Sequence, residues 1–309
     1  MTNNALLDNL GDVKLNDTVV FVAKVKEYQI LKTKANKDYV ACTLANVHGT
    51  VTGKVWDAIE ANRYTPVDIQ HKVVKCTGLV SEYNGTYEVK IMSLELLADG
   101  TYNINDVERS ADGNALAQEF MTYFNALPAD WQLVVNHLFA CIEKGWDRFC
   151  VAYAASGYHD AQRCGLINHT VKMLRILDVV LKNDNRLEEL RNLLTVGVMI
   201  HDLGKIEEME NGVYNKDAYI NHRMRGITYL TRKESVIKEA VGTDNFNRLM
   251  SIVHEHHGGL GAEPMHTIYA LLVFMVDNCD AQFTNVADVM SGVTQPVTRG
   301  ENIGIRYDD

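Results

Sequence analysis

The chain has 309 residues, of which 47% are hydrophobic, and it carries a formal net charge of −10. This length allows two domains, and this composition is ordinary for a globular protein and excludes a disordered chain. The negative charge argues against a protein that coats nucleic acid by bulk electrostatics, and no stretch approaches the ~18 consecutive apolar residues of a membrane helix.

Residues 15–98 have the pattern of short β-strands. The segments that alternate in polarity or are rich in β-branched residues are Thr18–Lys26, Tyr39–Leu44, Gly49–Trp56, Val73–Val80 and Thr86–Leu94. Asn84-Gly85, which lies between the last two segments, is the strongest short signal for a β-hairpin. Five short strands separated by polar turns predict a small closed barrel.

The apolar period changes to that of α-helices from Asn114 onward. Leu116, Phe120 and Phe124 recur every four residues and so mark one face of an amphipathic helix. Further helical segments are expected at Pro128–Glu143, Leu166–Leu181, Leu187–Ile200, Ala218–Thr231, Val236–Val241, Phe246–His256 and Thr267–Phe283. We therefore predict an all-helical domain over 115–285, a polar linker over 99–114, and a C-terminal tail without periodicity over 286–309.

Charge also divides the chain into two parts. Residues 15–98 contain ten Lys/Arg and nine Asp/Glu, so their net charge is +1 and that of the remaining residues is −11. This difference suggests two modules with different tasks. The six cysteines form no CxxC pair and the N-terminus lacks a signal-peptide pattern, so we expect reduced thiols in a cytoplasmic protein without a membrane partner.

The helical part contains a concentration of histidines and carboxylates. Eight of the eleven histidines fall between His159 and His266. One histidine alone is most simply a core residue, but several together with carboxylates favour a metal site. His201-Asp202 end an apolar run, and Lys205 follows Asp202 by three residues, which places the two on one helical face. Imidazole and carboxylate ligands suit Mn²⁺, Fe²⁺, Co²⁺, Ni²⁺ or Zn²⁺ better than calcium.

These residues resemble a known pattern. The series His169, His201-Asp202, His222, His256-His257 and Asp277 looks like the HD superfamily of metal-dependent phosphohydrolases. The local motifs resemble those of the YhaM-type bacterial 3′-5′ exoribonucleases, which combine an N-terminal OB-fold with a C-terminal HD domain. Those motifs are GLINHT at 165–170, HDLGK at 201–205, EHHG at 255–258 and VDNCDA at 276–281. The resemblance covers roughly residues 15–285 and implies an OB-type barrel followed by an HD-domain helical bundle.

The resemblance also implies two divalent metal ions, with Mn²⁺ favoured and Mg²⁺, Co²⁺, Fe²⁺ and Ni²⁺ as alternatives. Asp202 would bridge the two ions, and Lys205 would supply positive charge to the phosphate. Two ions can activate a water molecule and hold the phosphodiester oxygens during displacement. The remaining ligands would be His169, His201 and Asp277 for one ion, and His222, His256 and His257 for the other.

Residues close to these positions leave alternatives open. Asp280 is either a hydrogen-bond partner of a ligand or a surface charge, and His254 is expected to support the site or to be structural. His159 and Arg163 either contact substrate phosphate or lie on the surface. The chain departs from the family pattern at Asn168, where an acidic residue often stands, and at Cys164, which replaces a glycine.

The barrel segment interleaves basic and aromatic residues. OB-type barrels bind single strands through basic grooves and aromatic platforms, because stacking tolerates any base. Each aromatic alone is better explained by core packing, and the lysine-rich loop 32–37 alone by a solvated turn. Taken together, the set predicted to contact a strand is Lys24, Lys32, Lys34, Lys37, Tyr39, Trp56, Tyr83 and Tyr87.

Three functions fit these features. The leading interpretation is a metal-dependent 3′-5′ exonuclease that acts on single-stranded RNA or DNA. A second is an HD hydrolase of nucleotides or cyclic dinucleotides. The tandem His256-His257 also occurs in HD proteins that open cyclic dinucleotides, but the GYP-type sequence that follows the histidine pair in those proteins is absent from this chain. A third is a non-catalytic single-strand-binding protein, which the full ligand set disfavours. The sequence leaves homo-oligomerisation open.

Overall fold

The computed structural model describes residues 15–83, 85–98, 100–108, 110–156, 160–215, 219–258 and 265–290. The chain divides into two compact units, Met1–Arg109 and Ser110–Asp309. This division falls inside the segment 99–114 that we expected to be a linker. None of the helices in the described part of the chain is both long enough and apolar enough to cross a membrane.

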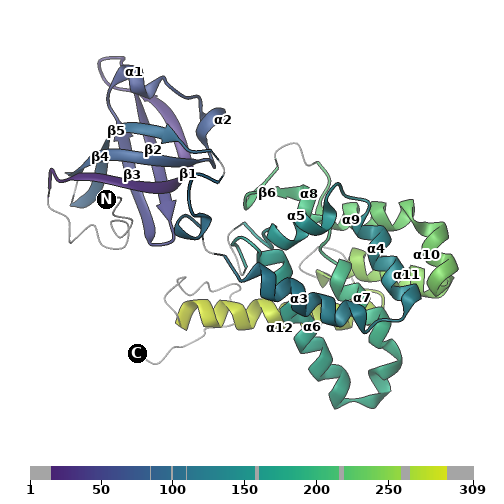
Figure 1. The fold of residues 1–309 in the computed structure, drawn as a ribbon. Helices are drawn as coiled ribbons and strands as arrows, with labels where there is room; N and C mark the ends of the chain where they lie inside the picture. The colour runs from purple at the N-terminus through teal and green to yellow at the C-terminus, as the bar shows by residue number, and fades with distance from the viewer. Residues whose placement is uncertain are drawn as a thin grey trace. The chain divides into compact units, whose positions relative to one another are not determined.

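The N-terminal unit is a closed five-stranded barrel (Figure 1). Its strands are β1 (Thr18–Lys32), β2 (Asp38–Asn46), β3 (Gly49–Val55), β4 (Val73–Tyr83) and β5 (Thr86–Leu96). The order around the barrel is β1-β2-β3-β5-β4, and only the β3–β5 pair is parallel. Two short helices, α1 (Ala58–Ala61) and α2 (Pro66–Ile69), connect β3 to β4. This five-stranded mixed barrel is OB-like and confirms the predicted fold class of the N-terminal unit.

The first strand is longer than its sequence pattern suggested. β1 pairs with β4 from Thr18 to Lys24 and with β2 from Lys24 to Lys32, and a bulge between Val25 and Glu27 interrupts its pairing with β2. The pattern did not predict the half beyond Lys26, because Tyr28 is its only residue buried in the barrel core. Ile30 and Leu31 are 37% and 38% exposed, so burial does not impose a simple alternation there.

The C-terminal unit is helical (Figure 1). Its long helices are α3 (Gly113–Asn125), α4 (Ala129–Phe139), α6 (Gly165–Asn183), α7 (Arg191–Ile200), α9 (His222–Arg232), α11 (Thr243–Glu255) and α12 (Ile268–Met290). Shorter elements of this unit are α5 (Gly145–Val151), α8 (Lys205–Glu208), α10 (Glu234–Val241), the 3₁₀ turn η4 (Asn185–Leu190), and a two-stranded ribbon, β6 (Met209–Glu210) with β7 (Val213–Tyr214). Another 3₁₀ turn, η3 (Ile104–Asp106), belongs to the N-terminal unit.

Helix α7 lies in the core of the helical unit and positions the site. All eight residues from Leu193 to Ile200 are buried, and the helix packs against α4, α6, α11 and α12. A helix that is apolar on every side is stable only when it is surrounded by other elements. Its C-terminal end therefore delivers His201 and Asp202 into the protein interior, where α6, α11 and α12 also contribute residues.

Candidate metal centre

The seven residues predicted as metal ligands converge in the helical unit. His169 comes from α6, and His201 and Asp202 come from the end of α7. His222 begins α9, His256 and His257 follow α11, and Asp277 lies on α12. Segments separated by up to 108 positions in the chain thus supply one cluster, and their assignment as ligands remains our proposal.

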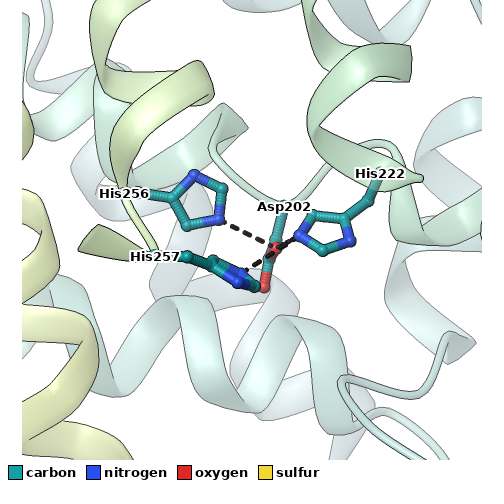
Figure 2. A group of neighbouring side chains, drawn as sticks. All are labelled: Asp202, His222, His256 and His257. Carbon is teal, nitrogen blue, oxygen red and sulfur yellow. Dashed lines mark hydrogen bonds and ion pairs between the residues drawn. The ribbon is translucent and has the colours of Figure 1, made fainter. Parts of the chain in front are cut away.

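Asp202 is at the middle of this cluster. Its Oδ1 lies 3.5 Å from Nε2 of His222 and 3.5 Å from Nε2 of His256. Figure 2 shows these two histidines, together with His257, around the Asp202 carboxylate. Its Oδ2 lies 3.3 Å from Nε2 of His201 and 3.9 Å from Nε2 of His169. The two oxygens of one carboxylate therefore face two different sets of imidazoles.

The donor atoms fall into two groups on this basis. Within each group the atoms lie within 4.8 Å of one another. One group is Asp202, His222, His256 and His257, and the other is His169, His201 and Asp277. These groups coincide with the two ligand sets that the resemblance implied, and a mixture of imidazole and carboxylate donors suits divalent transition metals.

Unpaired polar atoms provide a test of whether a metal fits. Among the described residues, four buried side-chain nitrogen or oxygen atoms have no hydrogen-bond partner, and three of them are His201 Nε2, Asp202 Oδ1 and His256 Nε2. A buried polar atom without a partner costs about 1–3 kcal/mol. Three such atoms directed into one cluster have the lone pairs that divalent cations take, so the donor set fits metal binding.

The other ring nitrogens fix the orientation of the imidazoles. His201 Nδ1 lies 2.8 Å from the main-chain oxygen of Val198, and His256 Nδ1 lies 3.0 Å from that of Val253. Each is a contact to the residue three positions earlier, at the end of a helix. An Nδ1–H that donates to such an oxygen leaves Nε2 as the acceptor, which is the form that binds a metal.

Two histidines are instead held by carboxylates. His169 Nδ1 lies 2.7 Å from Asp280 Oδ2, and His222 Nδ1 lies 2.6 Å from Glu208 Oε2. Asp280 is therefore a buried hydrogen-bond partner of a predicted ligand, which resolves the two alternatives left open for it. Sequence reasoning missed Glu208, because it belongs to no metal motif and lies 14 positions from its histidine.

Burial and charge determine the protonation of the cluster. Burial lowers the pKa of His256 to about 4 and that of His257 to about 3, so both rings are neutral near pH 7. Burial alone would raise the pKa of Asp202, but Lys205 and His201 hold it well below its usual range. Burial likewise opposes charge on His169, yet hydrogen bonds to Asp277 and Asp280 raise its pKa to about 10. The surroundings of His169 thus stabilise positive charge.

Lys205 and Gly204 have local reasons for their positions. Lys205 begins α8, and its Nζ lies 2.6 Å from Asp202 Oδ2. A Cβ on Gly204 would lie 2.1 Å from the main-chain oxygen of His222. A glycine is required there because the backbones of the HDLGK segment and of α9 approach so closely.

The remaining candidates lie elsewhere. His254 is exposed, and its main-chain oxygen accepts a hydrogen bond from Arg223 Nη1 at 3.1 Å, so this residue is on the outer side of α11. Arg163 is half-buried and forms a backbone bridge with Ser110. His159 and the tail from residue 291 lie outside the described residues.

On the barrel, Tyr39, Trp56 and Tyr83 of the predicted strand-binding set lie close to Lys54, which was not in that set. Tyr39 and Trp56 stack with ring centroids 4.8 Å apart and planes inclined by 14°. Lys54 Nζ lies 5.9 Å from the centre of the Trp56 ring and 4.4 Å from that of Tyr83. Trp56 is 46% exposed and Tyr83 is 60% exposed, so both rings offer a face to solvent. We call Tyr39, Lys54, Trp56 and Tyr83 the aromatic patch.

The lysines near this patch differ in their surroundings. Lys34 and Lys37 are exposed in the β1–β2 turn, and Lys32 pairs with Asp38 at 2.8 Å. Lys24 is only 3% exposed and forms an ion pair with Glu108, so the prediction that it contacts a strand is wrong. Tyr87 is partly buried against the barrel core.

Comparison with known proteins agrees with this geometry. Residues 166–282 match the HD domain family. This match runs from α6 into α12 and includes all seven predicted ligands. The chain therefore combines a helical unit that matches the HD domain family with an N-terminal OB-like barrel.

The chain is also YhaM-like over most of its length, which confirms the predicted resemblance. It is 24% identical over 293 residues to the 3′-5′ exoribonuclease YhaM of Bacillus subtilis (strain 168), covering 90% of each chain. It is 26% identical over 305 residues to that of Listeria welshimeri, covering 95% of this chain and 94% of the relative. The relative from Bacillus pumilus is 25% identical over 275 residues, covering 86% and 84%.

Proposed function

We propose that the protein is a metal-dependent 3′-5′ exonuclease that hydrolyses single-stranded RNA, with single-stranded DNA as a second substrate to be tested. The observation that carries this proposal is the Asp202 carboxylate, whose two oxygens face two separate sets of imidazoles. The similarity to relatives named as 3′-5′ exoribonucleases supports the choice of substrate and direction.

The metal centre would be held by both donor groups. Asp202 would serve both, because its Oδ2 also faces His201 and His169. When bound, two divalent cations supply the Lewis acidity that activates water and stabilises charge on the phosphate. Mn²⁺ suits these ligands, and Mg²⁺, Co²⁺, Fe²⁺ and Ni²⁺ are the alternatives to be compared.

The protein's own residues complete the chemistry. Lys205 holds a positive charge next to Asp202, where it would meet the negative charge that develops on phosphate oxygens. His201, Asp202 and His256 are 1%, 3% and 0% exposed, so bulk water has little access to their side chains. A fixed charge acts more strongly in such a site than in water.

The barrel would hold the rest of the strand. The aromatic patch presents two exposed rings beside a lysine on and next to β2, β3 and β4. OB-folds bind oligonucleotides with the face of strands 2 and 3 and the neighbouring loops, which supports a binding role for this patch. Stacking of a base on an aromatic ring contributes about 1–3 kcal/mol and does not depend on base identity. A substrate with several bases therefore gains more from this unit than a mononucleotide does.

The experiment incubates the purified protein with Mn²⁺ and single-stranded RNA or DNA labelled at the 5′ end. A ladder that shortens from the 3′ end is expected for the wild type and should disappear in Asp202→Ala. Asp244→Ala, the same change at an exposed aspartate of the same unit, is the matched control and should keep the ladder. Turnover of nucleotides or cyclic dinucleotides without cleavage of any strand would reject the proposal in favour of the second interpretation.

A further inference from the structure

Both ring nitrogens of His169 contact a carboxylate. Its Nε2 lies 3.2 Å from Asp277 Oδ1, and its Nδ1 lies 2.7 Å from Asp280 Oδ2. Both aspartates are on α12, three positions apart, whereas the histidine is on α6. One helix thus supplies a predicted ligand beside His169 and the group that orients its ring.

Asp280 also forms an ion pair with a lysine through its other carboxylate oxygen. It is 2% exposed, and its Oδ1 lies 3.1 Å from Nζ of Lys172 on α6. The same Nζ lies 2.7 Å from Asp160 Oδ2, so the lysine is shared by two buried carboxylates. Because a buried carboxylate without a cation is costly, Lys172 both stabilises Asp280 and fixes which of its oxygens faces the imidazole.

The other donor group has a separate support. Glu208 is 8% exposed and ends α8, and its Oε2 lies 2.6 Å from His222 Nδ1. It comes from a different element than Asp280 and holds a histidine of the other donor group. Each donor group therefore contains one histidine oriented by a carboxylate and one oriented by a main-chain oxygen.

We propose that Asp280 and Glu208 are positioning residues, each of which sets the metal affinity of one half of the centre independently of the other half. Asp280 acts on the half formed by His169, His201 and Asp277, and Glu208 acts on the half formed by His222, His256 and His257. The inference rests on the two-metal centre proposed above. A carboxylate that accepts the Nδ1 proton makes Nε2 a better and better-oriented donor, and loss of such a partner costs about 10–100-fold in metal affinity.

The test is a calorimetric titration of the metal-free full-length protein with Mn²⁺. Two sites are expected for the wild type. Asp280→Asn should weaken one of them by about 10–100-fold, and Glu208→Gln should weaken the other by a similar factor. Glu239→Gln, an exposed glutamate on α10, is the matched control and should change neither. Circular dichroism and thermal unfolding of the metal-free proteins verify that each variant folds.

An Asp277→Ala background identifies which half each residue serves. One tight site should remain there, and Glu208→Gln should weaken it while Asp280→Asn should not. Weakening of that remaining site by Asp280→Asn, weakening of both sites by either variant, or a single site in the wild type would overturn the inference. If Asp280→Asn does not fold, Glu208→Gln in the Asp277→Ala background still tests the inference. An unchanged Mn²⁺ affinity of the remaining site would contradict the role of Glu208.

These measurements separate the inference from the proposed activity. If the protein binds two ions and each variant weakens only its own site, but no strand is degraded, the positioning roles are supported and the nuclease activity is rejected. If the protein shortens RNA from the 3′ end, but either variant abolishes both metal sites, the nuclease activity is supported and the independent positioning roles are rejected.

Discussion

His222 Nε2 lies 3.1 Å from His257 Nε2, although the two rings come from α9 and from the end of α11. Burial lowers the pKa of His257 to about 3, so this ring is neutral near pH 7 and one of its two nitrogens has a free lone pair. The two Nε2 atoms are within hydrogen-bonding distance of each other, and in the other tautomer each can direct a lone pair at a cation. The pair therefore predicts that the folded protein is stabilised by metal.

We expect removal of metal with a chelator to lower the unfolding temperature by several degrees, and Mn²⁺ to restore it. Binding at 100 times the dissociation constant stabilises a protein by about 2.7 kcal/mol per site. His257→Ala should lose a large part of this gain. Differential scanning calorimetry at several Mn²⁺ concentrations measures the effect, and an unfolding temperature that does not depend on Mn²⁺ would contradict a metal centre here.

Lys205→Ala should separate catalysis from metal binding. The Lys205 Nζ lies 2.6 Å from Asp202 Oδ2. Because the ammonium group repels a metal cation at this carboxylate, its removal should not weaken metal binding. We expect kcat on RNA to fall by about 10²–10³-fold, as when one stabilising donor of a transition state is lost. Steady-state kinetics and metal analysis on the same preparation give the result. If metal content falls together with kcat, Lys205 has a structural role instead.

Trp56→Ala should weaken binding of strands more than it changes the chemical step. Loss of one stacked base costs about 1–3 kcal/mol, which corresponds to an increase in dissociation constant of roughly 5–150-fold. The effect should be large for long RNA and absent for a dinucleotide substrate, as judged by fluorescence anisotropy and by KM. Val67→Ala, an 88% exposed apolar residue on the same unit, is the control. Equal losses for both substrates would exclude a binding role for the aromatic patch.

Gly204→Ala tests the packing of the HDLGK segment. The new Cβ would lie 2.1 Å from the main-chain oxygen of His222, which cannot move without shifting α9. We expect a loss of about 1–3 kcal/mol in the free energy of unfolding, together with weaker metal binding. Chemical denaturation and Mn²⁺ titration of the variant measure the two effects. Normal stability would show that the backbone of α9 relaxes freely.

The sequence contained more information about the site than about its support. The order of His169, His201-Asp202 and Asp277 marked the cluster through a family resemblance, and periodicity placed each of them on or beside a helix. Glu208 had no such marker. A hydrogen bond between residues 14 positions apart depends on how α8 turns toward α9, which periodicity does not specify.

Lys24 illustrates the opposite error. A lysine in a β-strand is ordinarily solvated, and its neighbours in the sequence gave no reason to expect otherwise. The partner that buries it, Glu108, lies 84 positions away and beyond the last barrel strand. The barrel itself was predictable because its strands carry local alternation and a hairpin signal, whereas individual ion pairs across the fold were not.

Asp202, Lys205 and Glu208 recur at intervals of three residues along one short segment. The relative directions of these three side chains consequently depend on the number of residues between them. Each residue of a helix turns by about 100°, so inserting or deleting one residue between Asp202 and Glu208 would redirect the later side chains. Variation in chain length among such proteins should therefore be confined to places outside these seven positions, such as the ribbon of β6 and β7 that follows.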